Sequence, residues 1–197
     1  MSWQEDADEI VQVEPIVAKK DCKVEVTAAE SATWKVKDTV PGHGGEEYRA
    51  MKLTLLITDP DVQTEHEGSR PRLTLDHQLN LDRYPYLDKK SGTVKMLGRN
   101  NLYDLEEALG FDPMFQDAAG NPIEPFVTRT GRKVAPKGEG NKRVLNPAFL
   151  SAYFTGDGAP NLEWAGKTLY ADIGVERSEQ YGDKNTILRF KRPPVTV

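Results

Sequence analysis

The sequence has few of the features that mark a membrane protein, a disulfide scaffold or a zinc protein. Cys22 is the single cysteine among 197 residues, so an internal disulfide is excluded and no cysteine pair has zinc-type spacing. No segment approaches the roughly 20 consecutive apolar residues that cross a bilayer. The acidic start, residues 4–9, lacks the basic region of a signal peptide. We therefore expect a cytoplasmic protein without a membrane partner.

Catalytic motifs are also missing. The sequence has no Gly-x-Ser-x-Gly, no P-loop, no dinucleotide fingerprint and no cysteine–histidine pair with an orienting acid. An acidic loop with two residues downstream could hold Mg²⁺ or Mn²⁺ in a nuclease, although its spacing matches no ligand motif and a polar connection explains it equally well. These residues are Asp59, Asp61, Glu65, His66, Glu67, Asp76 and His77, of which His77 falls on an apolar face typical of a core imidazole. We predict a non-enzyme with no metal and no cofactor.

The charge is sorted along the chain. The net charge of −5 at first argues against nucleic acid, because phosphate neutralisation supplies most non-specific affinity. All the charged residues among residues 1–14 are acids. Residues 129–143 instead contain six bases and a single acid, Glu139. These bases are Arg129, Arg132, Lys133, Lys137, Lys142 and Arg143. The overall sign therefore says little about any one face of the molecule.

Five segments alternate between apolar and polar residues with the period of two that predicts half-buried strands. They cover residues 22–36, 51–58, 72–82, 166–176 and 184–192. A break in the alternation at residues 28–31 predicts a bulge or a bend in the first strand. In the last strand, Leu188 and Phe190 are expected to share one face. Tyr181-Gly182-Asp183 supplies turn chemistry between the last two strands.

Two short helices are predicted among these strands. Asn100 or Asn101 can cap one that ends at Gly110, and Asn146-Pro147 supplies the cap and first-turn proline of another. The intervening stretch, residues 112–145, is rich in proline and glycine and predicts a loop or arm outside the core.

The order of elements is that of a five-stranded OB-fold, a mainly β barrel with short helices, with a long insertion between the helix and strand 4. We expect an acidic, poorly ordered leader over residues 1–20, one OB-fold domain over 21–192 that includes the basic arm 112–145, and a C-terminal tail over 193–197.

Several short blocks between residues 22 and 192 resemble the OB-fold single-stranded DNA-binding proteins that bacteriophages encode. The blocks are Lys23–Glu30 leading to Trp34, Leu53–Thr58, Leu79–Asp82, Leu105–Leu109, Ala165–Leu169 and Tyr181–Asn185. The resemblance implies non-catalytic coating of single-stranded DNA in phage replication or recombination, in the host cytoplasm, with self-association and contacts to replication or recombination proteins. Many such proteins end in an acidic tail, whereas this chain ends in residues 192–197 with no acid, so the leader is the only equivalent segment.

Single-strand binders combine cations along the phosphates with aromatic faces on which bases stack. The cation candidates are the six bases of the arm, together with Lys52 and Arg72 on strands two and three. The stacking candidates are Tyr48, Tyr84, Tyr86 and Tyr181, which lie at the ends of elements among polar neighbours. Trp34, Phe149, Phe154 and Phe190 fit core positions instead. A solvated arm and an ordinary wet strand face are the alternatives for the cations.

Two other functions remain open from the sequence. One is a protein-interaction module of a replication complex that binds its partner through the acidic leader. The other is the metal-dependent nuclease of the acidic loop.

Overall fold

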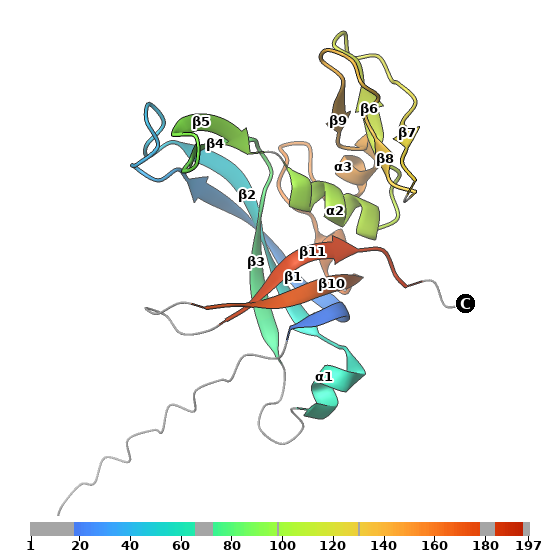
Figure 1. The fold of residues 1–197 in the computed structure, drawn as a ribbon. Helices are drawn as coiled ribbons and strands as arrows, with labels where there is room; N and C mark the ends of the chain where they lie inside the picture. The colour runs from blue at the N-terminus through green and yellow to red at the C-terminus, as the bar shows by residue number, and fades with distance from the viewer. Residues whose placement is uncertain (1–17, 66–72, 98, 130, 178–183, 195–197) are drawn as a thin grey trace, which may run out of the picture.

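A five-stranded antiparallel sheet organises the chain (Figure 1). The structure, a computed structural model, describes residues 18–65, 73–97, 99–129, 131–177 and 184–194. The sheet order is β11-β10-β1-β2-β3. The bounds are β1 Lys19–Lys35, β2 Glu47–Ile57, β3 Thr74–Asn80, β10 Thr168–Glu176 and β11 Lys184–Lys191. The predicted mainly β class is confirmed.

The long first strand bends where the sequence pattern breaks. β1 pairs with β10 on one side and with β2 on the other, and its register with β2 shifts between Val26 and Ala28. Such a shift is a β-bulge, which sharpens the local twist and lets one strand serve both halves of a curved sheet. The predicted bulge is confirmed.

The core lies on the inner face of this sheet. Val24, Val26, Leu53 and Leu55 are fully buried there, and residues of three short helical segments pack against them. These segments are α2 Asn100–Ala108, α3 Pro147–Tyr153 and the 3-10 turn η1 Leu162–Trp164. Among the described residues, no helix has the length and apolar character needed to cross a membrane.

The two edge strands of the sheet, β3 and β11, meet through side chains. The rings of His77 and Phe190 contact each other edge to face, with 5.6 Å between their centroids. Burial lowers the pKa of His77 to about 4, as the predicted core position implies. No hydrogen-bonded ladder joins β3 to β11 among the described residues. The closed barrel of the sequence prediction is therefore not found.

The helices follow the predicted pattern with one correction. Asn146 caps α3 as predicted, since its side chain accepts a hydrogen bond of 2.9 Å from the backbone of Ala148. In α2, however, the N-cap position is Arg99 and Asn100 is already helical. Gly110 follows this helix with φ +90°, a conformation that favours glycine. The short helix α1, Pro60–Glu65, has too few residues to show a helical period.

One hairpin has no counterpart in the sequence prediction. It consists of β4 Tyr84–Asp88 and β5 Thr93–Leu97, and we call it the β4–β5 hairpin. Pro85 lies within β4, and every residue of β5 is exposed, so neither strand shows a clear alternation. Its turn is closed by the Gly92 amide, which donates to the Asp88 carbonyl over 2.8 Å.

The arm, residues 112–145, is ordered into two small ladders. β6 Met114–Gln116 pairs with β9 Lys142–Val144, and β7 Phe126–Val127 pairs with β8 Lys133–Val134. Within the described part of the arm, Phe115 is buried at 3% exposure but does not belong to the main core cluster, and Leu145 packs partly against that cluster. The arm therefore lies mostly outside the main core, but it is not the irregular loop that the sequence predicts.

The predicted face of Leu188 is wrong. The β10–β11 register shifts between Asp172 and Ile173, so Ile187 and Phe190 point inward while Leu188 is 60% exposed. A Cβ placed on Gly174 would lie 3.0 Å from the Leu188 side chain, so a residue without a side chain suits this contact. Ile187 and Leu188 are adjacent and both apolar, so an alternating pattern does not show which of them faces inward.

Candidate nucleic-acid interface

The outer face of β1, β2 and β3 carries a row of polar and aromatic residues. Residues directly opposite each other in an antiparallel pair place their side chains on the same face of the sheet. The pairs on this face are Trp34 with Tyr48, Ala50 with Asn80, and Lys52 with Gln78. Met51 and Leu53, which alternate with them on β2, are buried in the core.

At one end of this face, aromatic side chains surround a hollow of about 250 Å³. We call it the aromatic hollow and define it by Trp34, Tyr84, Tyr86, Lys37 and Lys89. The rings of Trp34 and Tyr84 are tilted by 50°, with 5.6 Å between their centroids. Lys37 and Lys89 are exposed, and neither forms an ion pair with a residue that the structure describes. The hollow therefore combines ring faces with available positive charge.

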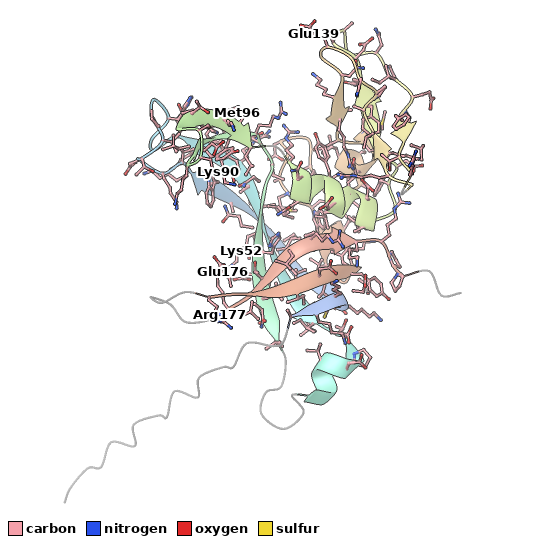
Figure 2. All side chains as sticks on the ribbon, in the orientation of Figure 1. Lys52, Lys90, Met96, Glu139, Glu176 and Arg177 are labelled. Carbon is pink, nitrogen blue, oxygen red and sulfur yellow. The ribbon has the colours of Figure 1, made fainter. Side chains whose placement is uncertain are left out.

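The turn of the β4–β5 hairpin is fixed by one carboxylate. Asp88 accepts hydrogen bonds of 3.0 Å from the Lys90 amide and the Ser91 hydroxyl, and Lys95 also donates to it. The Lys95 ammonium, followed by the other two donors, lowers the pKa of Asp88 to about 2. Asp88 is thus ionised at neutral pH and holds the turn that carries Lys89 and Lys90. Figure 2 shows Lys90 and Met96 on this hairpin, well apart from Glu139 on the arm.

The sequence-predicted tyrosines divide into three groups. Tyr84 and Tyr86 line the aromatic hollow. Tyr48 lies across from Trp34, and its hydroxyl donates to Glu46 over 2.6 Å. Tyr181 lies outside the described residues. The core position expected for Trp34 is wrong because β1 changes its facing at the bulge, and Trp34 lies on the outer face, half-buried against Tyr84.

Arg143 has a structural role instead of a free guanidinium. It donates to Glu106 over 2.9 Å and to Glu107 over 2.6 Å, and its guanidinium lies 4.4 Å from the ring centroid of Tyr103. Burial is the main cause that raises the pKa of Glu106, and the hydrogen bonds from the Asn146 amide and from Arg143 oppose it. Arg143 therefore fastens the arm to α2.

Other predicted cations are divided between paired and available groups. Lys133 pairs with Asp112 over 3.0 Å, and Lys52 pairs with Asp76 over 2.7 Å. Arg72 lies outside the described residues. Four cations of the arm form no ion pair with any residue in the described ranges, and these are Arg129, Arg132, Lys137 and Lys142. Figure 1 shows that the arm and the β4–β5 hairpin project separately from the sheet.

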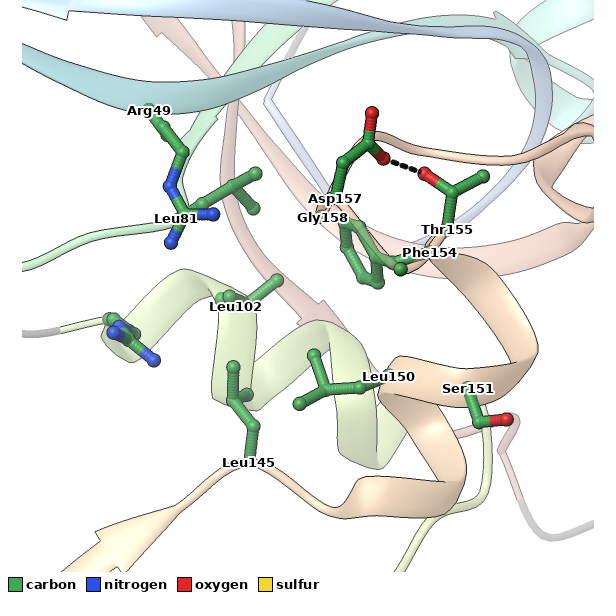
Figure 3. A pocket seen from close by; sticks show the side chains of 12 residues that line it. Arg49, Leu81, Leu102, Leu145, Leu150, Ser151, Phe154, Thr155, Asp157 and Gly158 are labelled. Carbon is green, nitrogen blue, oxygen red and sulfur yellow. Dashed lines mark hydrogen bonds between the residues drawn. The ribbon is translucent and has the colours of Figure 1, made fainter.

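A larger hollow of about 500 Å³ lies between the sheet, α2 and α3 (Figure 3). Leu81, Leu102 and Phe154 line it, and Figure 3 shows Arg49 at its border. The Arg49 guanidinium makes two hydrogen bonds with Asp82, of 3.0 and 2.9 Å. Its charge is therefore balanced, and this hollow suits an anionic backbone less well than the aromatic hollow does.

The acidic loop is held together by protein groups in its described part. Asp59 accepts a hydrogen bond of 2.7 Å from Lys19, one of 3.2 Å from the Lys23 amide and one of 3.2 Å from the Asp61 amide. Lys19 also pairs with Asp61 over 2.9 Å. His66 and Glu67 lie outside the described residues. Among the residues described, no three histidine, cysteine or acidic side chains are grouped as metal ligands would be.

The chain matches no protein-family model, no curated protein and no solved structure.

Proposed function

We propose that this protein binds single-stranded DNA without catalysis, along the outer face of β1–β2–β3 and under the β4–β5 hairpin. One observation carries the proposal: three aromatic rings and two lysines without an ion pair among the described residues line the same hollow. Stacking on a ring is worth about 1 to 3 kcal/mol per base and needs no particular sequence, while lysines follow the phosphates. Both requirements of a single-strand binder are thus met in one place.

The strand pairing supports an OB-type arrangement for this proposal. β1 lies between β2 and β10, α2 follows β3 in the chain, and the β3 and β11 edges touch through His77 and Phe190. A partly open OB barrel binds oligonucleotides on its second and third strands, which correspond to β2 and β3 here. Together with the sequence resemblance, this arrangement supports a role in bacteriophage DNA replication or recombination.

Fluorescence titration with oligothymidylate tests the function. Binding to the single strand is expected at low salt, with affinity that falls linearly with the logarithm of salt concentration because counterions are released. A duplex of equal length should bind more weakly, because its bases are stacked on each other and cannot reach Trp34. Absence of single-strand binding, or equal affinity for the duplex, would overturn the proposal.

A second candidate function, protein interaction, is favoured by the arm. Phe126 and Val127 on β7 are 61% and 55% exposed, which is unusual for large apolar side chains that lie next to each other. The arm is the better placed surface for a replication or recombination partner, while the hairpin serves DNA. Removal of residues 1–17, the part of the leader before β1, distinguishes a partner site on the arm from one on the leader, because only binding through the leader would then be lost.

A further inference from the structure

A second hollow adjoins the aromatic hollow and has different chemistry. Its volume is about 200 Å³, and we call it the amide hollow. Tyr84 lines both hollows. The polar side chains around the amide hollow are those of Gln78, Asn80, Arg99, Asn100 and Asn101. Four of these five are carboxamides, which are neutral and carry both donors and acceptors.

Two buried polar atoms of this hollow have no hydrogen-bond partner within the described residues. They are Oδ1 of Asn80, an acceptor, and Nε of Arg99, a donor. A buried unpaired group costs about 1 to 3 kcal/mol, so native proteins retain one for a reason. The strand register explains in part why the Asn80 oxygen is unpaired. The residue opposite Asn80 on β2 is Ala50, whose methyl group offers no hydrogen bond.

Asp82 neutralises Arg99 only in part, because the same carboxylate accepts two hydrogen bonds from Arg49. One terminal nitrogen of Arg99 lies 4.0 Å from Asp82. The wall of the hollow therefore holds one unsatisfied donor and one unsatisfied acceptor beside an aromatic ring. A phosphate has no hydrogen to donate and cannot satisfy the Asn80 oxygen, whereas the edge of a base carries both donors and acceptors. These features suit the edge of a neutral base better than a phosphate.

We propose that the amide hollow receives one unstacked nucleobase of the bound strand and reads its edge, an inference that rests on the proposed function. Asn80 accepts from an exocyclic amine or a ring N–H of the base, and Arg99 donates to a ring nitrogen or a carbonyl. Recognition of splayed bases on their hydrogen-bonding edges is a common mode for single strands. Stacking in the aromatic hollow is tolerant of sequence, whereas this hollow makes affinity depend on the base.

The substitution Asn80→Asp tests this reading with almost no change of shape. It replaces the amide NH₂ by an oxygen, so the side chain can only accept, and such a carboxylate favours the amine of cytosine. We expect the ratio of oligodeoxycytidylate to oligothymidylate affinity to rise about threefold to tenfold relative to the wild type, the effect of one hydrogen bond. The contribution of base stacking within each oligomer cancels from the comparison, because the same two oligomers enter the ratio for the variant and for the wild type.

Asn185→Asp is the matched control. The Oδ1 of Asn185 on β11 is also buried without a described partner, but Asn185 lines neither hollow. The control should weaken both oligomers by the same factor through its added negative charge. If Asn80→Asp does not fold, as judged by its thermal unfolding, Gln78→Glu in the same hollow is measured instead and should shift the ratio in the same direction.

The outcomes separate the two proposals. Equal ratios in the wild type, the hollow variant and the control overturn base reading and leave single-strand binding intact. Absence of any single-strand binding by the wild type overturns both.

Discussion

The β4–β5 hairpin and the arm both project from the sheet and both carry basic side chains, but these side chains have different surroundings. Beside the hairpin, Lys37 follows β1 and Lys89 lies in the hairpin turn; both line the aromatic hollow and have no ion pair among the described residues. In the arm, the basic stretch looks stronger in the sequence, yet Arg143 is bound to Glu106 and Glu107 and Lys133 is bound to Asp112. The other four bases of the arm form no ion pair with a described residue, but none of them lines the aromatic hollow or the amide hollow. The difference teaches that a count of basic residues does not locate a polyanion site, because the acids that neutralise them come from elsewhere in the chain.

The first prediction compares two arginines of the arm. Arg143→Leu removes the guanidinium from Glu106, whose side chain is fully buried, and should lower the free energy of unfolding by about 3 to 5 kcal/mol. Arg132→Leu, which breaks no ion pair with a described residue, should change it by less than about 0.5 kcal/mol. Urea denaturation measures both. Adding Glu106→Gln to Arg143→Leu should restore part of the loss, and equal effects of the two single variants would contradict the structural role of Arg143.

The second prediction compares one aromatic residue of the aromatic hollow with one of the arm. Trp34→Leu should weaken oligothymidylate binding by about 5-fold to 150-fold, since it removes one stacking surface worth about 1 to 3 kcal/mol. Phe126→Leu on the arm should leave the affinity unchanged, although Phe126 is the more exposed of the two. Titration of both variants by fluorescence anisotropy decides. A larger loss for Phe126→Leu would move the DNA site to the arm.

The third prediction separates folding from binding through pH. The pKa of His77 is about 4 in the folded protein and about 6.5 when the chain is unfolded, so the unfolded state takes up the proton first as pH falls. Between pH 7 and pH 5 this histidine should lower the free energy of unfolding by about 2 kcal/mol. The stability of His77→Leu should depend less on pH than that of the wild type, and an unchanged dependence would contradict this role of His77. Lysine and tyrosine do not titrate in this range, so DNA affinity of the folded protein should not follow the same curve.

The fourth and smallest effect concerns salt. The double variant Lys37→Gln with Lys89→Gln should reduce the slope of log affinity against log salt by about 1.4, which corresponds to two phosphate contacts of a single strand. The matched arm variant, Arg132→Gln with Lys142→Gln, should leave the slope unchanged. The reverse result would make the arm the phosphate-binding region.

Much of the sheet could be predicted from the sequence. Alternation along β1, β2, β3 and β10 reports burial of one face, and the break after Val26 reports the bulge, because each pattern is set by neighbours in the chain. Asn146 and Pro147 predicted α3 in the same way, since a helix cap is a local interaction. The β4–β5 hairpin could not be predicted in this way, because β4 contains Pro85 and all of β5 is exposed, so neither strand alternates between apolar and polar residues.

The site was only partly accessible from the sequence. Tyr84 and Tyr86 were identified from their polar surroundings, and they do line a hollow. Trp34 was assigned to the core because its apolar character does not say which face of a bent strand it occupies. The carboxamides of the amide hollow gave no signal at all, since Asn80 and Asn100 come from different elements and their unpaired atoms become visible only when these elements pack together.

By itself, the sequence determined the five strands of the main sheet, the helices α2 and α3, and that no internal disulfide can form. Only the tertiary structure decided which cations are neutralised, which aromatic rings share a hollow, and that the edges of the sheet touch without a ladder. The physical reason is range: hydrogen-bond periodicity and side-chain burial leave a local pattern in the chain, whereas charge pairing and ring contacts depend on residues far apart in sequence that only the fold brings within a few ångströms.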